Sequence, residues 1–556
     1  MLPPEAMTDS TGTDRTVTDR LGRARVATRA RLGRSSVGWR AWHQIVPRPA
    51  LLIAAVLAVG VSTVPLVYLA VRTAEAGWPR IAAVLRTPGL GELTLRSLAL
   101  AAVVTAGCLV VGVGTALLVV RTDLPARRFF AVVAALPLAI PTYVAGYAWV
   151  SLLHDFHGFA AAALVLILCC SPYVYLPTAA ALAGADPATE EAARALGRGP
   201  WATFVGVTLR QIRPAITAGA LLVALYVLSD FGAVAILRVN TFTLAIFTSF
   251  NLGFDRTGAL VLSTALVLLT MAILVGELVA RRTTTRYARV GSGARRPPER
   301  IALGRWRPLA FAGLAAVALA ALGIPAAALA RWFSIGVSRP GSLAEIAAAM
   351  GNTLTFSAAG AALTILLALP IGLLGARAPG PVAATLDRIT YLSHALPGVV
   401  VGLSLVFFGI NVAYPLYQTP WLLALAYAVL FLPLGVGAVA GAAAQAPPGL
   451  EEAARSLGRG PLAVFRTITL PLTLPGIGAG AALVFLTCMK ELPATLLLRP
   501  TGADTLATEL WTHTSVAAYA AAAPYAALLV LLAAIPTWLL AVRSGATGAA
   551  VIGGGS

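Results

Sequence analysis

The polar residues best suited to a specific task occur in one segment that is present twice. The first copy, residues 190–200, reads Glu-Glu-Ala-Ala-Arg-Ala-Leu-Gly-Arg-Gly-Pro. The second copy, residues 451–461, differs only by Ser456 in place of Ala195. Both are polar islands in a mostly apolar chain, so their chemistry is that of surface contact rather than of catalysis. We interpret them as two docking elements that receive a mechanical push from a separate protein.

Each copy predicts a helix, a glycine turn and a second short helix. Glutamates in the first turns complement the helix macrodipole, two alanines leave a small face for close approach, and a left-handed glycine ends the helix. Gly199 and Pro200 would start the second helix, and Pro214 would end it. A re-entry loop without a partner is the alternative, but capping alone does not require the same surface residues twice. The candidate docking residues are Glu190, Glu191, Ala192, Ala193 and Gly197, with Glu451, Glu452, Ala453, Ala454 and Gly458 in the second copy.

Three ionisable residues lie inside or at the end of apolar runs, namely Asp230, Lys490 and Glu491. Such residues are costly within a membrane and usually mark a function. One interpretation is that they line a translocation path or pair across an interface between two halves. The other is a local Lys490–Glu491 pair that neutralises itself for packing. Ser229 and Asp230 occupy the repeat position of Lys490 and Glu491, which favours the path.

Other reactive side chains do not form a recognisable site. His154 and His157 flank a short loop whose composition is more typical of a solvated turn than of a metal site. Lys490 is the only lysine, and Met489 precedes it, so the chain lacks the Gly-Lys-Ser/Thr of a nucleotide-binding loop. The sequence contains no His-Glu-x-x-His, no Gly-x-Ser-x-Gly and no dinucleotide-binding fingerprint before a strand. We therefore expect no catalytic site, no metal site and no cofactor, and any ATP must be held by another subunit. Cysteines are confined to apolar runs, without zinc-like spacing, at Cys108, Cys169, Cys170 and Cys488.

Composition indicates what must position these residues. The chain has 556 residues, of which 58% are hydrophobic and 11% are charged, so it does not suit a soluble domain. The apolar runs are continuous and reach about 20 residues, which predicts membrane-spanning helices rather than a barrel. The formal charge of +19 comes from arginines clustered between apolar runs. That pattern assigns the basic charge to the cytoplasmic face and its anionic lipid rather than to nucleic acid.

The fold class expected is therefore an all-α integral membrane protein with about twelve spans in two tandem six-helix halves. We expect an Arg-rich cytoplasmic tail over 1–49, a first membrane domain over 50–282, a linker over 283–307, a second domain over 308–545 and a C-terminal tail over 546–556. Spans are expected near 50–71, 94–120, 130–152, 158–184, 215–237 and 257–280, and again near 308–331, 353–376, 388–411, 420–445, 476–497 and 521–542. Loop charge places both termini, the linker and both docking segments in the cytoplasm.

The repeat extends beyond the docking segments. Ser97 precedes Arg121 by the same number of residues as Thr353 precedes Arg377. Residues 135–137 read Ala-Leu-Pro, as do residues 395–397. An even number of spans in each half predicts two halves that point the same way. We expect a pseudo-twofold axis along the membrane normal, with the path between the halves.

The docking segments resemble the EAA motif of permease subunits in binding-protein-dependent ABC importers, and the resemblance covers about residues 50–545. Residues 136–144, 230–234 and 489–500 look like the ferric-iron importer permeases, in which two permease domains are fused. The resemblance implies that each loop inserts a coupling helix into an ATPase dimer. It also implies delivery by an extracytoplasmic substrate-binding protein and residence in a bacterial cell (inner) membrane. The long Arg-rich tail departs from the family pattern.

Two alternatives remain open at this stage. Related permeases carry thiamine, polyamines or phosphonates, and the spans show no dense set of ligands that would fix the substrate. An ion-coupled secondary transporter that uses Asp230 and Glu491 as coupling sites would explain the repeat. It would leave the paired docking segments without a role.

Overall fold

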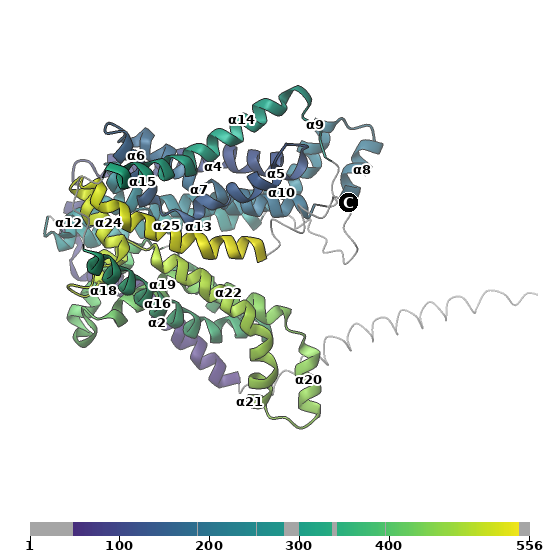
Figure 1. Ribbon diagram of the computed structural model, residues 1–556. Helices are drawn as coiled ribbons and strands as arrows, with labels where there is room; N and C mark the ends of the chain where they lie inside the picture. The colour runs from purple at the N-terminus through teal and green to yellow at the C-terminus, as the bar shows by residue number, and fades with distance from the viewer. Residues whose placement is uncertain are drawn as a thin grey trace, which may run out of the picture.

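The chain folds into a bundle of helices in two repeated halves (Figure 1). The computed structural model describes residues 48–185, 187–251, 253–282, 300–335, 342–394 and 396–543. Over these ranges there is no strand, and a single isolated bridge joins Thr122 to Ile301. The expected N-terminal tail up to residue 47, linker residues 283–299 and the C-terminal tail over 546–556 lie outside the described part.

The two halves share their longer helices in the same order, from α4 to α13 in the first half and from α16 to α25 in the second. The first half comprises α2 (Arg48–Glu75), α3 (Trp78–Leu85), α4 (Leu90–Arg121), α5 (Arg127–Val133), the 3-10 turn η2 (Leu136–Ala139), α6 (Thr142–Leu152), α7 (Phe159–Ala183), α8 (Pro187–Ala195), α9 (Pro200–Thr203), the π turn η3 (Phe204–Thr208), α10 (Leu209–Ser229), α11 (Gly232–Ile236), α12 (Phe242–Asn251) and α13 (Arg256–Arg282). The second half comprises α14 (Arg307–Ala318), η5 (Leu319–Gly323), α15 (Ile324–Ile335), α16 (Leu343–Arg377), α17 (Pro381–His394), α18 (Gly398–Asn411), α19 (Pro420–Gln445), α20 (Pro448–Ser456), α21 (Pro461–Val464), the π turn η7 (Phe465–Thr469), α22 (Leu470–Met489), α23 (Pro493–Leu498), α24 (Leu506–Ser515) and α25 (Tyr519–Arg543).

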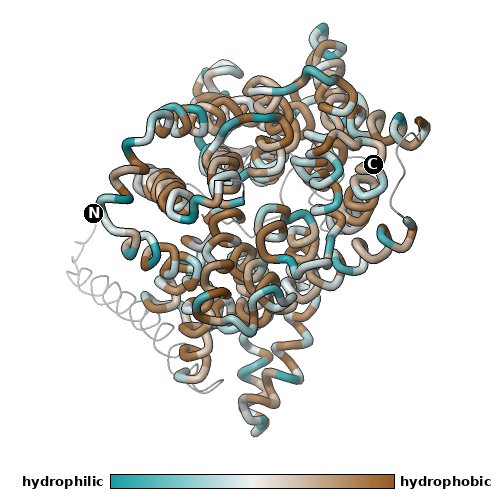
Figure 2. The backbone as a smooth tube through the Cα atoms, turned by 90° about the vertical axis from the view of Figure 1, so that its left-hand side faces the viewer, coloured by the Kyte–Doolittle hydropathy of each residue, from teal (hydrophilic) through white to brown (hydrophobic). Residues whose placement is uncertain are grey.

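This architecture confirms the expected all-α membrane fold. Within the described residues, nine helices are long and apolar enough to cross a membrane, and the bent pair formed by residues 127–139 and 142–152 makes a tenth candidate. The shorter apolar helices α18 and α25 occupy the positions of the remaining expected spans. Side chains such as Leu57, Val110 and Leu366 are exposed on the outside of the bundle, as on a surface that faces lipid. Figure 2 shows the hydrophobic colouring running along the helices, with hydrophilic residues concentrated in the connections.

The expected continuous spans over 130–152 and 388–411 are wrong in detail, because both are broken. The first bends by 94° between η2 and α6. The breaks occur at Pro141 and Pro397, which are extended (ψ 144° and 145°) and directly precede α6 and α18. Proline has no N–H to continue a helix, and its ring disfavours a helical preceding residue. The spans expected over 215–237 and 476–497 likewise stop early, at Ser229 and Met489.

The structure also corrects one match between the halves. Pro141 and Pro397 are equivalent, because each caps the helix after the break with the same backbone conformation. The sequence match of residues 135–137 with 395–397 is therefore shifted by four residues. The match of Ser97 with Thr353 is supported, since Ser97 Oγ accepts the N–H that begins α12 (3.2 Å) and Thr353 Oγ1 accepts the N–H that begins α24 (2.9 Å).

Both docking segments lie at one end of the bundle. Figure 1 shows α8 and α20 at the same end, whereas α12 and α24 lie at the opposite end. Close packing within each half supports this arrangement. A Cβ added at Gly112 of α4 would lie 2.8 Å from Val174 of α7, and one added at Gly372 of α16 would lie 2.8 Å from Val439 of α19. These glycines let the long helices approach closely enough to carry the loops at their ends.

Candidate functional site

In the first docking helix, α8, one glutamate faces inward. Glu190 is only 6% exposed, and its Oε2 lies 2.5 Å from Nη2 of Arg121 at the end of α4. Its Oε1 accepts a 2.8 Å hydrogen bond from Thr208 Oγ1 in η3. Glu190 therefore joins the docking helix to the ends of two membrane-spanning helices. Paired in this way, a buried carboxylate is stabilised by charge and by hydrogen bonds together.

The second docking helix, α20, is held by the equivalent three residues. Arg377, which ends α16, places Nη2 2.7 Å from Glu451 Oε1. Thr469 Oγ1 in η7 donates to the same carboxylate oxygen at 3.1 Å. Glu451 is 1% exposed, so this contact is also buried. We call these two groups the first anchor (Arg121, Glu190, Thr208) and the second anchor (Arg377, Glu451, Thr469).

The remaining candidate docking residues divide into an exposed set and a buried set. Glu191 and Ala192 are exposed, as are their equivalents Glu452 and Ala453. Ala193 and Ala454 are buried within the chain itself, at 7% and 6% exposure. We expected both alanines of each pair to form a small open face. In the structure only the first alanine of each pair is exposed.

The glycine after each docking helix adopts the conformation that was expected. Gly197 has a φ of 81° and Gly458 a φ of 80°, both in the left-handed region. The N–H groups of Gly197 and Arg198 bond back to the carbonyls of Arg194 and Ala193, at 2.9 and 3.1 Å, which closes the helix. Pro200 then begins α9, as predicted.

The predicted stop at Pro214 is wrong. Pro214 lies inside α10, which continues to Ser229. The preceding π turn, η3, joins α9 to α10, and η7 does the same between α21 and α22. A π turn makes one extra residue fit into the helix, and it supplies Thr208 or Thr469 to the anchor. The second half of each docking segment is therefore continuous with a membrane-spanning helix.

The last residues of the linker contact the C-terminal end of α4, where Arg121 of the first anchor lies. Ile301 exchanges backbone hydrogen bonds with Arg121 and Asp123, at 2.8 and 3.3 Å. The Asp123 side chain accepts from the N–H of Leu303 at 2.9 Å, and Arg307 donates to the Asp123 carbonyl at 2.8 Å. Residues 301–307 thus lie against the helix end that holds Glu190.

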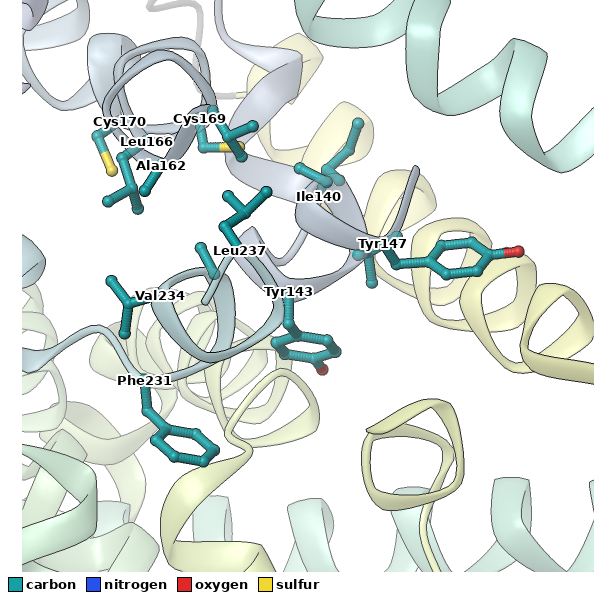
Figure 3. Close-up of a cluster of buried hydrophobic side chains, with 14 of the residues drawn as sticks. Ile140, Tyr143, Tyr147, Ala162, Leu166, Cys169, Cys170, Phe231, Val234 and Leu237 are labelled. Atoms are coloured by element: carbon teal, nitrogen blue, oxygen red, sulfur yellow. The ribbon is translucent and has the colours of Figure 1, made fainter. Parts of the chain in front are cut away.

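The three candidate path residues line one cavity of about 230 Å³. It lies between the helix breaks of the first half and the α22–α23 junction of the second half. Besides Asp230, Lys490 and Glu491, its wall includes Tyr143, Cys169, Cys170, Tyr173, Tyr226 and Leu138. Figure 3 shows three of the lining residues, Tyr143, Cys169 and Phe231, as members of the buried cluster of the first half. The structure therefore brings together residues that are separated by about half of the sequence.

Asp230 and Glu491 hold equivalent positions. Asp230 Oδ2 accepts the N–H groups of Ala233 and Val234 at 3.0 and 3.3 Å, and its Oδ1 accepts from Thr142 Oγ1 at 2.6 Å. Glu491 accepts the N–H groups of Ala494 and Thr495, both at 3.0 Å. Each carboxylate thus caps the short helix that follows the end of a spanning helix.

Lys490 bonds across the interface between the halves. Its Nζ donates to the carbonyl oxygen of Leu138 in η2 at 2.9 Å. Within the described part of the chain, neither Lys490 nor Glu491 forms an ion pair, so the local neutralising pair is not observed. Ser229, at the repeat position of Lys490, is too short for an equivalent contact, so the two sides of the cavity differ.

The loop that contains His154 and His157 is a turn, as its composition suggested. The N–H of Phe156 bonds to the carbonyl of Leu153 at 2.9 Å, and the Phe156 ring stacks on Trp149 with 4.8 Å between centroids. Both histidines are exposed. Over the described residues, no group of His, Cys, Asp and Glu side chains is arranged to hold a metal ion.

Sequence reasoning missed several residues that the structure adds to these sites. The sequence showed that Arg121 follows Ser97 at the same distance as Arg377 follows Thr353. This equal spacing was a usable signal, but it did not give either arginine a role. Thr208 and Thr469 each follow their anchor glutamate by 18 residues, which was a second usable signal. Tyr143 and Leu138 lie in the segment 136–144 that resembles ferric-iron permeases, but nothing in the sequence indicated that either one faces the second half.

Comparison with known proteins assigns the family. The family described as "Binding-protein-dependent transport system inner membrane component" matches residues 108–285 and again residues 368–543. The chain is 38% identical over 480 residues to the "Fe(3+)-transport system permease protein FbpB 2" of Haemophilus influenzae, covering 86% of this chain and 94% of that protein. It is 40% identical over 154 residues to the "Molybdenum transport system permease protein ModB" of Escherichia coli, covering 24% of this chain and 65% of that protein. The chain therefore belongs to the binding-protein-dependent ABC import permeases, as a fused protein that carries two copies of the family's inner membrane component.

Proposed function

We propose that this permease conducts ferric iron through the cavity between its halves, and that a separate ATPase drives it through α8 and α20. The supporting observation for the cargo is the similarity to the Fe(3+)-transport permease along almost the full length of both chains. The cavity fits a cation, because it holds the carboxylates of Asp230 and Glu491 with one ammonium, that of Lys490. Hard cations prefer oxygen ligands of this kind.

The coupling proposal rests on the two anchors. Exposed residues of α8 and α20 (Glu191, Ala192, Glu452 and Ala453) form the surface offered to an ATPase dimer. The buried Glu190 and Glu451 transmit a displacement of that surface to the spanning helices. Gly197 and Gly458 set the turn that presents each helix. The drive is a population shift, in which closure of the ATPase favours one packing of the spans.

The remaining assignments follow from the family and the charge pattern. We place residues 50–282 and 308–545 as the two permease domains, joined by the linker over 283–307. Both termini and both docking loops face the cytoplasm of a bacterial cell, and the protein resides in its inner membrane. An extracytoplasmic substrate-binding protein delivers the cargo to the opposite face.

Cargo identity is tested by reconstitution. The chain is placed in liposomes with its ATPase, and its binding protein is supplied outside with ferric iron, molybdate, thiamine or a phosphonate. We expect ATP hydrolysis and accumulation of the cargo to rise with ferric iron alone. If another of these substrates stimulates ATP hydrolysis and accumulates, and iron does not, that substrate is the cargo and the ferric assignment is wrong.

A further inference from the structure

One buried polar group in the cavity has no role in the contacts described so far. The hydroxyl of Tyr143 is shielded from solvent and has no hydrogen-bond partner among the described residues. Several other hydroxyls share this property, but Tyr143 is the one among them that lines the cavity. A buried polar group that lacks a partner is unfavourable and calls for an explanation.

The position of Tyr143 is fixed by its surroundings. The side chain is 3% exposed and begins one residue after Thr142, which bonds to Asp230. Its ring lies against Gly232, where an added Cβ would come within 2.7 Å of the Tyr143 Cβ. Figure 3 shows the ring projecting away from Leu166 and Cys169, with its hydroxyl on the side of the second half.

Glu491 lies on the other side of the interface from Tyr143. Tyr143 and Glu491 nevertheless line the same cavity, one from each half. The Glu491 carboxylate fits beside Gly398, the residue at the position that Thr142 occupies in the first half. A Cβ at residue 398 would lie only 2.5 Å from Glu491 Oε1, so a side chain there would displace the carboxylate. In the first half the equivalent space is filled by the Thr142–Asp230 hydrogen bond. Glu491 also accepts a 3.0 Å hydrogen bond from Thr495 Oγ1, so all its hydrogen-bond donors belong to the helix that follows it. The two ends of the cavity therefore differ, because Thr142 bonds to Asp230 from a separate helix and Gly398 offers Glu491 no side chain.

We propose that Tyr143 of the first half and Glu491 of the second half form a transient oxygen-ligand site for a trivalent hard cation, the cargo in transit. This inference rests on the proposed ferric cargo. Binding joins the phenol oxygen to the metal ion as the O–H bond breaks, and the proton leaves to water, so no electrons are transferred. Carboxylate and phenolate oxygens are ligands that ferric iron accepts. Because the ligands come from different halves, occupancy of the site depends on how the halves pack.

The other titratable groups of the cavity are consistent with this assignment. The Lys490 ammonium is held on the Leu138 carbonyl, 2.9 Å away, which leaves Glu491 without an ion-pair partner in the described chain. Cys169 and Cys170 of α7 and Tyr226 of α10 also line the cavity, all from the first half. Tyr143 and Glu491 supply oxygen alone, the ligand type that a hard cation prefers.

The test is a visible difference spectrum of the full chain in lipid nanodiscs, titrated with ferric citrate against ferric citrate alone. A phenolate bound to ferric iron gives a charge-transfer band, which a carboxylate or a water ligand does not. We expect the band in the wild-type chain, its loss in Tyr143→Phe and a weakened band in Glu491→Gln. Tyr175→Phe is the matched control, because this buried tyrosine lies outside the cavity and donates to the Ala131 carbonyl. It should keep the band.

Several outcomes would overturn the proposal. A band that survives Tyr143→Phe, or one that is lost in Tyr226→Phe instead, places the iron elsewhere. If wild-type protein transports iron in liposomes but shows no band, the proposed site is wrong and the proposed function is unaffected. If the band depends on Tyr143 but the chain transports no iron, the metal site is supported and the proposed cargo is wrong. Circular dichroism of each variant confirms that it is folded.

Discussion

The guanidinium of Arg121 lies 2.5 Å from the carboxylate of Glu190, and both side chains are more than nine-tenths buried. Arg377 and Glu451 repeat this ion pair in the second half at 2.7 Å. The pairs join α4 to α8 and α16 to α20, so each docking helix is fixed to a long spanning helix. In the proposed coupling, these pairs carry a displacement of α8 and α20 to the spanning helices.

Loss of either arginine should release its docking helix. Removing one partner of a buried ion pair costs about 3–5 kcal/mol, because the other charge stays buried without compensation. We expect Arg121→Met or Arg377→Met to lower the thermal stability of the protein and to reduce cargo-stimulated ATP hydrolysis. The measurements are thermal unfolding in detergent and ATPase activity of the reconstituted complex.

The control for these variants removes both charges at once. In Arg121→Met with Glu190→Gln, no uncompensated charge remains, so stability should recover while coupling stays low. If the double variant regains full stimulation of ATP hydrolysis, the pair serves packing alone and the transmission role is wrong.

Gly197 and Gly458 should be sensitive to side chains for conformational reasons. Both have a φ near 80°, and an added Cβ meets nothing within 4 Å. A left-handed residue with a side chain costs about 1–2 kcal/mol even where space is free. We expect Gly197→Val with Gly458→Val to insert into the membrane normally but to uncouple transport from ATP hydrolysis.

Gly199 and Gly460 provide the matched control. They lie two residues further on, also have open space at Cβ, and are not among the glycines with positive φ in the described chain. Gly199→Ala with Gly460→Ala should transport at close to the normal rate. Equal loss in both pairs of variants would show that any change in the loop matters, which argues against the specific turn.

Lys490 should hold the two halves together around the cavity. Its bond to the Leu138 carbonyl has a charged donor, and such bonds contribute about 1.5–3 kcal/mol. We expect Lys490→Met to raise ATP hydrolysis in the absence of cargo, since the packing that closes the cavity is weakened. ATPase activity with and without the loaded binding protein measures this effect. An unchanged basal rate would mean that the bond does not restrain the halves.

The sidedness of the docking helices can be read by thiol labelling. All four native cysteines are buried, so they contribute little background to a membrane-impermeant reagent. Glu191→Cys and Glu452→Cys introduce thiols at exposed positions of α8 and α20. We expect both to be labelled in inside-out vesicles and protected in intact spheroplasts. Labelling of either one from the outside would invert the proposed topology.

The helical membrane fold and the repeat could be predicted because hydrophobicity and spacing are local properties of the sequence. The helix breaks could not. Pro141 and Pro397 end helices, whereas Pro172, Pro177 and Pro370 remain inside continuous ones. Neighbouring helices and side chains can satisfy the carbonyls that a proline frees, so the outcome depends on tertiary packing.

The candidate sites were predictable to different degrees. The docking residues were found because they repeat, but the repeat does not say which glutamate faces inward. Glu190 is buried only because Arg121 and Thr208 converge on it from other elements. The grouping of Asp230 with Glu491 followed from their equivalent positions. The bond from Lys490 to Leu138 requires the relative placement of the halves, which no local pattern encodes.

The central claim is that this chain is a conduit worked by a separate ATPase. Its most direct test is ferric iron uptake into proteoliposomes that contain the chain with its binding protein. Uptake is measured in the presence and absence of the ATPase subunit, and each measurement is repeated with a proton uncoupler. The account predicts uptake that requires the ATPase and ATP and that persists when the proton gradient is collapsed. Uptake by the chain without the ATPase, abolished by the uncoupler, would contradict it.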